Sequence, residues 1–135
     1  MTIMIIRRKG NIGCELLQPC LLKYPASSDS FVVIDTSGVH EVGLDYCGCR
    51  ADVNETTQLL RFRLYPATIH SPNTATTFQC LHHFQLLSFE SKCSVYEYFQ
   101  TLVRESDNTG LKNVKVCSSF VFASLSYEIY LLETL

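Results

Sequence analysis

The residues best suited to chemistry in this chain are two cysteines separated by one glycine, Cys47-Gly48-Cys49, with His40 seven residues upstream of the first. Thiolates at this spacing can both reach one tetrahedral zinc ion, and Gly48 lacks the Cβ that would resist a tight bend. The same cysteines could instead be small buried side chains, since free cysteine packs like a small hydrophobe. A structural zinc site needs four ligands, and the sequence offers no second close cysteine pair, so the pattern indicates half a site.

Three enzyme chemistries find little support in the residues. A cysteine–histidine nucleophile built on Cys80 with His82 or His83 needs side chains that face each other. Positions 80 and 82, two apart in a helix, do not face each other. Asp35 follows an apolar strand, as the metal-binding carboxylate of RNase H-type nucleases does, but no second acid is placed to share metal ions with it. A turn-forming role for Asp35 is simpler. The six glycines show no phosphate-binding arrangement, so we predict that the chain is not an enzyme.

The composition limits the class of protein further. The 135 residues, 47% of them hydrophobic, are enough for one domain with a packed core. A net charge of -2 and an isoelectric point near 6.0 give no overall attraction to nucleic acid. Arg61 and Arg63 could contact phosphate locally, but the solvated outer face of a strand explains them more simply.

The cysteines and the first ten residues favour the interior of the cell. Seven cysteines are an odd number, and the opening MTIMIIRRKG places apolar residues before basic ones, the reverse of a secretory signal. A reducing compartment keeps thiols for metal binding, catalysis or packing instead of disulfides. The most apolar stretch, residues 116–127, is shorter than the ~20 apolar residues that cross a bilayer, so we expect no membrane partner.

The elements that must position the cysteine pair begin with a predicted hairpin. Residues 31–34 form a β-branched run typical of a buried strand, residues 35–38 are turn formers, and residues 39–46 alternate like a half-buried antiparallel strand. Because His40 and Cys47 are an odd number of positions apart, they face opposite sides of a regular strand. A bulge at Gly43 would let them converge, and without one His40 is a core or edge histidine.

Residues 58–65 alternate apolar and basic, which predicts a third strand. Ser71-Pro72-Asn73 predicts the start of a helix at 73–90 that is apolar on nearly all sides, and Ser94 with Glu97 forms a capping box for a second helix at 94–106. We therefore predict an α+β fold, in which a small antiparallel sheet from residues 31–65 packs against these two helices as a fragment of a larger module. Residues 1–30 are a predicted lead-in or degenerate N-terminal part, and the periodicity of residues 111–135 does not distinguish strand from helix.

Several short motifs together resemble one known family. They are the Gly-Val-His before the Cys-x-Cys pair, the Gln-Leu-Leu-Arg segment, Pro66-Ala67-Thr68, the Pro-x-Thr-Ala-x-Thr-Phe segment and the Asp-Asn-Thr turn. The segment that contains them, residues 31–110, resembles the CxC-type cysteine-cluster domain associated with KDZ (Kyakuja, Dileera, Zisupton) transposases of fungal DNA transposons. Residues 111–135 do not share the resemblance and form a divergent tail.

The resemblance implies a non-catalytic, zinc-binding module that lies N-terminal to a transposase catalytic region. Transferred by matching position, it makes Cys47 and Cys49 thiolate ligands of zinc, with His40 and Cys14 as further candidates. The family carries more cysteines upstream than the Cys14 and Cys20 found here, which predicts an incomplete metal site. The catalytic carboxylates of the family are expected beyond residue 135, so the resemblance is to a truncated member.

The same resemblance sets the expected partners and location. It implies transposon DNA, engaged through the parent transposase, a protein partner or the remainder of the transposase, and the nucleus as the compartment. Arg61 and Arg63 are the candidate nucleic-acid contacts. The alternatives are a metal-free small protein-interaction module, in which the helix at 73–90 docks on another chain, and a non-functional transposon relic.

Overall fold

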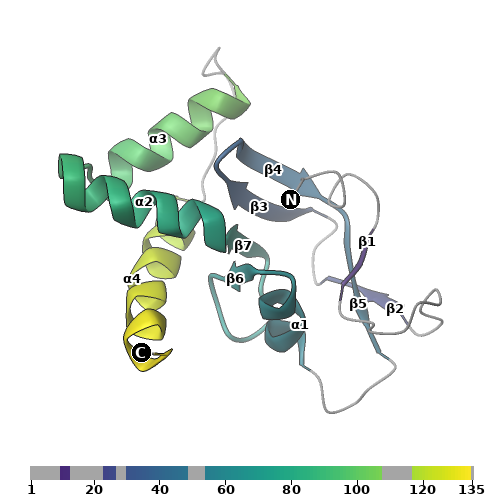
Figure 1. The fold of residues 1–135 in the computed structure, drawn as a ribbon. Helices are drawn as coiled ribbons and strands as arrows, with labels where there is room; N and C mark the ends of the chain where they lie inside the picture. The colour runs from purple at the N-terminus through teal and green to yellow at the C-terminus, as the bar shows by residue number, and fades with distance from the viewer. Residues whose placement is uncertain (1–9, 13–22, 27–29, 49–53, 108–116, 135) are drawn as a thin grey trace.

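The computed structural model describes residues 10–12, 23–26, 30–48, 54–107 and 117–134, which form two small sheets and four helices (Figure 1). The strands are β1 (Gly10–Ile12), β2 (Lys23–Pro25), β3 (Phe31–Asp35), β4 (Gly38–Val42), β5 (Leu44–Cys47), β6 (Leu64–Pro66) and β7 (Thr74–Thr77). The helices are α1 (Glu55–Arg61), α2 (Phe78–Ser91), α3 (Val95–Ser106) and α4 (Cys117–Thr134). The helices α2, α3 and α4 gather on one side of the molecule, opposite β1, β2 and β5 (Figure 1).

The larger sheet has four strands in the order β4-β3-β7-β6. Strand β3 pairs antiparallel with β4, with Phe31 opposite Val42, and parallel with β7. Strand β6 closes the other edge, antiparallel to β7. The α+β class and the hairpin are thus confirmed, while the parallel pair between β3 and β7 is an addition that the sequence did not predict. Nearly all of β3 is buried, which suits a β-branched apolar strand inside a sheet.

The strand predicted for residues 39–46 is divided at Gly43, the position where a bulge would have let His40 and Cys47 converge. Strand β4 ends at Val42, and β5 begins at Leu44 and joins a second sheet with the order β1-β5-β2. Strand β5 runs parallel to β1 and antiparallel to β2. The break therefore places His40 and Cys47 on different sheets.

The strand predicted for residues 58–65 is wrong in most of its length, because residues 55–61 are helical. Helix α1 begins after Asn54, whose side chain accepts a hydrogen bond from the Thr57 N–H at 2.8 Å. Glu55 in the first turn and Arg61 in the last turn both suit the helix dipole. The apolar alternation that indicated a strand is produced by the end of a helix, a turn and the short strand β6.

The helix predicted from residue 73 also starts later than expected. Residues 74–77 form β7, where buried Thr74, Ala75 and Thr76 pair with neighbours on both sides. Helix α2 begins at Phe78, and Thr77 caps it by accepting a hydrogen bond from the Cys80 N–H at 3.2 Å. The β-branched threonines favour the strand, and the need to fill the gap between β3 and β6 decides it.

Helix α3 is confirmed together with its capping box, in which Ser94 and Glu97 satisfy each other's backbone N–H groups. It packs on β4, where Gly38 has a φ of 128° and a Cβ would collide with Ser106 Oγ. That serine hydroxyl accepts a hydrogen bond from the Val39 N–H, which ties the end of α3 to the hairpin. None of the helices in the described part of the chain is long and apolar enough to cross a membrane.

The buried apolar side chains form two separate clusters, which we call the helix cluster and the sheet cluster. The helix cluster joins α2, α3 and α4 through residues that include Leu81, Phe84, Tyr98, Phe99, Phe120 and Tyr127. The sheet cluster joins the two sheets and α1 through Phe31, Val33, Leu44, Tyr46, Leu59, Leu64 and Ala75. The region predicted as a divergent tail therefore supplies part of the helix cluster through α4.

Candidate functional site

Cys47, the first residue of the cysteine pair, is the last residue of β5, and its side chain is only 6% exposed. The side-chain amide of Gln58 holds its backbone at two points. The Cys47 N–H donates to Gln58 Oε1 at 2.8 Å, and Gln58 Nε2 donates to the Cys47 carbonyl at 2.9 Å. Strand β1 pairs with β5 up to Ile12 opposite Tyr46, and at the next residue of β5, Cys47, the Gln58 amide pairs with the backbone as a strand residue would. The backbone that leads into the cysteine pair is thereby fixed.

Gln58 can make these bonds because α1 turns one face toward the sheets. Gln58 and its neighbour Leu59 are both 0% exposed, and Leu59 belongs to the sheet cluster. A buried amide is costly unless its donor and acceptor are both paired, and here each has a backbone partner. Gln58 was not predicted from the sequence, since a buried glutamine has no periodic signal and its partner lies eleven residues away in the chain.

Two tyrosines lie near this corner of the molecule. Tyr24 of β2 and Tyr46 of β5 face each other with ring centres 5.7 Å apart. Burial raises the pKa of Tyr46, and the charges of Glu55 and Tyr24 raise it further. Burial, followed by Glu55 and Cys47, also raises the pKa of Tyr24. Both phenols are therefore neutral at physiological pH and supply no base to Cys47.

His40 lies on β4, opposite Val33 of β3. Its Nε2 atom is 2.8 Å from Ser37 Oγ, and the Ser37 hydroxyl donates a hydrogen bond to Asp35 Oδ2 at 2.9 Å. Because the single hydroxyl proton of Ser37 goes to the carboxylate, His40 Nε2 is the donor in the first of these bonds. The lone pair of His40 is then on Nδ1, the nitrogen that a metal ion would have to use.

Asp35 ends β3 and is buried, at 5% exposed. Its carboxylate accepts hydrogen bonds from Thr77 Oγ1 at 2.7 Å, from Ser37 Oγ at 2.9 Å and from the Ser37 N–H at 3.3 Å. Burial alone would raise the pKa of Asp35, but the hydrogen bonds from Thr77 and Ser37 outweigh it and lower the pKa. The turn-forming role predicted for Asp35 is confirmed, and its link to the start of α2 through Thr77 is a further role.

Of the four predicted zinc ligands, the structure describes the positions of two, Cys47 and His40. Cys49 and Cys14 lie outside the described residues, and Cys47 and His40 lie on different sheets. The residues that the structure describes contain no group of three or more cysteine, histidine, aspartate or glutamate side chains able to hold a metal ion. The assignment of Cys47, Cys49, His40 and Cys14 as ligands stays a prediction.

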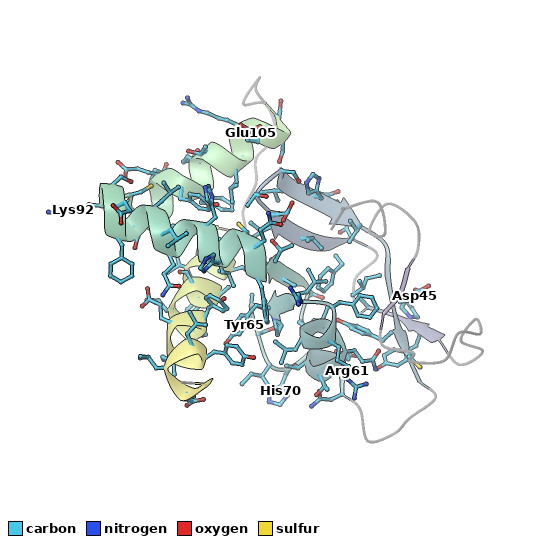
Figure 2. All side chains as sticks on the ribbon, viewed as in Figure 1. Asp45, Arg61, Tyr65, His70, Lys92 and Glu105 are labelled. Carbon is cyan, nitrogen blue, oxygen red and sulfur yellow. The ribbon has the colours of Figure 1, made fainter. Side chains whose placement is uncertain are left out.

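The two candidate nucleic-acid contacts are close together at the end of α1. Arg61 is the last residue of the helix, and Arg63 lies in the turn that follows, with a φ of 57°. Both side chains are exposed. Figure 2 shows Arg61 on the same side of the molecule as Asp45 of β5, away from α2 and α3. Their placement on a helix end instead of a strand corrects the sequence analysis, and the contact with phosphate stays a prediction.

Cys80, the best candidate nucleophile in the sequence, is 0% exposed in the helix cluster. Burial, with a smaller contribution from the charge of Asp35, raises the pKa of Cys80 to about 12, although the hydrogen bond between the sulfur and the Tyr98 hydroxyl at 3.9 Å acts in the opposite direction. The thiolate that a nucleophile requires is therefore scarce at neutral pH. His83 Nδ1 is 2.7 Å from the Tyr98 hydroxyl, a partner that was not predicted from the sequence.

Comparison with known proteins gives one match. The family model described as "CxC2 like cysteine cluster associated with KDZ transposases" matches residues 9–110, about three quarters of the 135 residues. The match includes the cysteine pair, α1, α2 and α3, and it ends at Gly110, before α4. No curated protein and no solved structure matches the chain.

Proposed function

Because the chain belongs to the family of CxC2-like cysteine clusters associated with KDZ transposases, we propose that it is a non-catalytic zinc-binding module of a transposase. Its parent would engage transposon DNA, or assemble the transposase, in the nucleus. Zinc, when bound, would act as a structural cross-link between thiolates and not as a reaction centre. Cys47 and Cys49 would supply thiolate ligands, and His40 and Cys14 are the further candidates.

The single observation that carries this proposal is the two-point hydrogen bonding of Gln58 to the Cys47 backbone. Metal ligands work best when the backbone and neighbouring side chains fix them before the ion binds. Cys47 meets that requirement, and Gly48, which follows it, allows the chain to bend toward a second sulfur. His40 fits less well, because its Nε2 donates to Ser37 and only Nδ1 is left for an ion.

A non-catalytic role is supported by the state of the most reactive residue types. Cys80 is buried as a neutral thiol, and the Asp35 carboxylate accepts hydrogen bonds from Thr77 and Ser37. For DNA, the overall charge of -2 argues for local contacts, and exposed Arg61 and Arg63 are the best placed for them. Such contacts would add to those of the parent transposase and would not hold DNA alone.

Metal analysis of the purified chain tests the proposal. We expect about one zinc ion per chain by elemental mass spectrometry, as one shared tetrahedral site requires. Cys47→Ser with Cys49→Ser should abolish it, whereas Cys93→Ser is the matched control, because Cys93 lies between α2 and α3 and bonds the Ser94 carbonyl. Cooperatively folded protein that contains no metal and does not change its melting temperature with added zinc or chelator would contradict the proposal.

A second candidate function is a metal-free protein-interaction module that docks through α2. This helix was expected to be apolar on nearly all sides, and it exposes Leu86 at 51% and Phe89 at 76%. Two large exposed apolar side chains one turn apart are typical of a contact surface. The metal-free outcome of the zinc experiment would favour this function.

A further inference from the structure

Phe62 is a large apolar side chain that the fold leaves at the surface between two arginines. It follows the last residue of α1, and its side chain is 42% exposed. It belongs neither to the helix cluster nor to the sheet cluster. Arg61 precedes it and Arg63 follows it, and both of these side chains are exposed as well. We call residues 61–63 the RFR turn.

The RFR turn lies in a part of the chain that has no acidic residue. Residues 56–89 contain no aspartate or glutamate, whereas the whole chain has 13 acidic residues against 11 lysines and arginines. Glu55 is in the first turn of α1, at the other end of that helix from Phe62. Figure 2 labels one acidic residue, Asp45, on the same side of the molecule as Arg61. The turn is therefore locally basic in a chain that is acidic overall.

Hydrogen bonds hold the backbone of the RFR turn at both ends. The Phe62 N–H donates to the Leu59 carbonyl at 3.0 Å, and the Arg63 N–H donates to the Leu60 carbonyl at 2.9 Å. The Arg63 carbonyl accepts a hydrogen bond from the Phe78 N–H at 3.1 Å, which joins the turn to the start of α2. Arg63 has a φ of 57°, in the left-handed region where glycine is usual after a helix. Strain at such a position is typical of a residue that is kept for its side chain.

An exposed phenylalanine is by itself no binding site. Phe89 and Phe122, the other exposed phenylalanines among the described residues, have no basic residue within two positions. Phe62 has one on each side, and the Cα atoms of these two arginines are at most about 7.6 Å apart, because consecutive Cα atoms are about 3.8 Å apart. Proteins that bind single-stranded nucleic acid combine cations that follow the phosphates with an aromatic ring that stacks on a base.

We propose that the RFR turn binds unpaired DNA. The Phe62 ring would stack on one base, and Arg61 and Arg63 would each contact a phosphate of the same strand. In a duplex the base faces are covered by neighbouring base pairs, and only base edges and phosphates are left for a protein. This inference rests on the proposed function, in which the parent transposase engages DNA, and it names the single-stranded form as the one that this turn takes.

The number of contacts predicts a weak interaction. One ring and two cations are fewer contacts than a whole DNA-binding protein makes, so we expect a dissociation constant of about 0.1–1 mM for the 135-residue chain. NMR titration with a short oligothymidylate measures affinities in this range. A duplex and an abasic oligonucleotide of the same length are the comparison ligands, since they carry phosphates without accessible base faces. Both should bind at least ~5-fold more weakly.

Substitutions at Phe62 test the stacking. Phe62→Leu should weaken binding to oligothymidylate at least ~5-fold and leave binding to the abasic oligonucleotide unchanged. Phe89→Leu is the matched control, because Phe89 is 76% exposed on α2 and should have no effect. The chain contains no tryptophan, so Phe62→Trp introduces a single fluorophore. Its fluorescence should be quenched by oligothymidylate and not by the abasic oligonucleotide.

Salt dependence tests the arginines separately. Each phosphate contact with a single strand contributes about −0.7 to the slope of log affinity against log salt concentration, so two contacts predict about −1.4. Arg61→Gln should halve this slope, whereas Phe62→Leu should leave it unchanged. Arg104→Gln, at an exposed position in the last turn of α3, is the control. Arg63→Gly should also halve the slope without lowering the melting temperature, because glycine adopts a positive φ without strain.

The outcomes separate this inference from the proposed function. Duplex binding as tight as single-strand binding, or single-strand binding that Phe62→Leu does not weaken, would overturn the stacking and leave the arginine contacts with DNA in place. Tighter binding of a single-stranded RNA of matched length, or equal binding of polyglutamate, would overturn unpaired DNA as the ligand. A chain that binds neither form of DNA at millimolar concentration would overturn both the stacking and the arginine contacts.

Discussion

Gln58 is the residue that most directly connects the fold to the proposed metal site. Its amide completes the pairing of β5 at Cys47, and it is 0% exposed while doing so. Because the amide offers one donor and one acceptor in the geometry of a peptide group, it can stand in for a neighbouring strand. The backbone of the residue before Gly48 is thus held in place by a side chain of α1.

We predict that Gln58→Met lowers the free energy of unfolding by about 2–4 kcal/mol, because it keeps the side-chain volume but leaves a buried N–H and a buried carbonyl without partners. Chemical denaturation measures the change. Gln79→Met is the control, since Gln79 is exposed on α2 and the same substitution there should change stability by less than ~0.5 kcal/mol. Equal effects at the two positions would show that the Gln58 bonds do not hold Cys47.

For single residues, hydrogen bonds to near neighbours in the sequence could be predicted, and those to residues far along the chain could not. The turn-forming role of Asp35 follows from its position before Thr36 and Ser37, and its bond to the Ser37 N–H confirms it. The burial of Gln58 depends on a strand that lies eleven residues earlier, and the link from Asp35 to Thr77 spans forty-two residues. Neither contact leaves a pattern in the neighbouring sequence.

The same distinction holds for elements. The hairpin and α3 have local signals, a turn-forming tetrapeptide in one and a capping box in the other, and both were predicted. Strand β7 was misassigned because its pairing, above all with β3 far earlier in the chain, decides it. Helix α1 was misassigned although Asn54 caps it locally, because the alternation of residues 58–65 indicated a strand instead. Thr74 to Thr77 could continue α2 toward its N-terminus, but as β7 they lie between β3 and β6 and pair with both.

The junction between β7 and α2 depends on one hydroxyl. Thr77 Oγ1 donates to Asp35 and accepts from the Cys80 N–H, so it ends the strand, caps the helix and stabilises a buried carboxylate. Thr77→Val keeps the shape and removes both bonds, and we expect it to lower the free energy of unfolding at pH 7 by about 2–4 kcal/mol. Thr77→Ser keeps both bonds and should cost much less.

The loss caused by Thr77→Val should depend on pH in a definite direction. The pKa of Asp35 is lowered below its ordinary 3.8 in the folded chain, so its ionised form stabilises the fold above that value. This stabilisation disappears as the pH falls through the folded pKa. The difference between Thr77→Val and the parent chain should therefore be constant near neutral pH and shrink below about pH 4. Urea denaturation at several pH values measures it, with Thr101→Val on the exposed side of α3 as control. A difference that grows at acid pH would contradict the role of Asp35.

At the scale of the whole molecule, the family-matched segment and the folded unit do not coincide. The match ends at Gly110, but α4 begins at Cys117 and closes the helix cluster against α2 and α3. Phe120 stacks on Tyr98 with ring centres 5.8 Å apart and lies 5.9 Å from Phe99. This packing could not be predicted from the sequence, because a helix that is apolar on two faces has no clear period.

If α4 is part of the core, its two faces should respond differently to the same substitution. Phe120 is 0% exposed and Phe122 is 64% exposed, two positions apart on one helix. We expect Phe120→Ala to lower the free energy of unfolding by about 3–5 kcal/mol, since it leaves a cavity among packed rings. Phe122→Ala should change it by less than ~0.5 kcal/mol. Thermal and urea denaturation measure both. Equal, small losses at the two positions would mean that residues 117–134 are an appendage and that the helix cluster is complete without them.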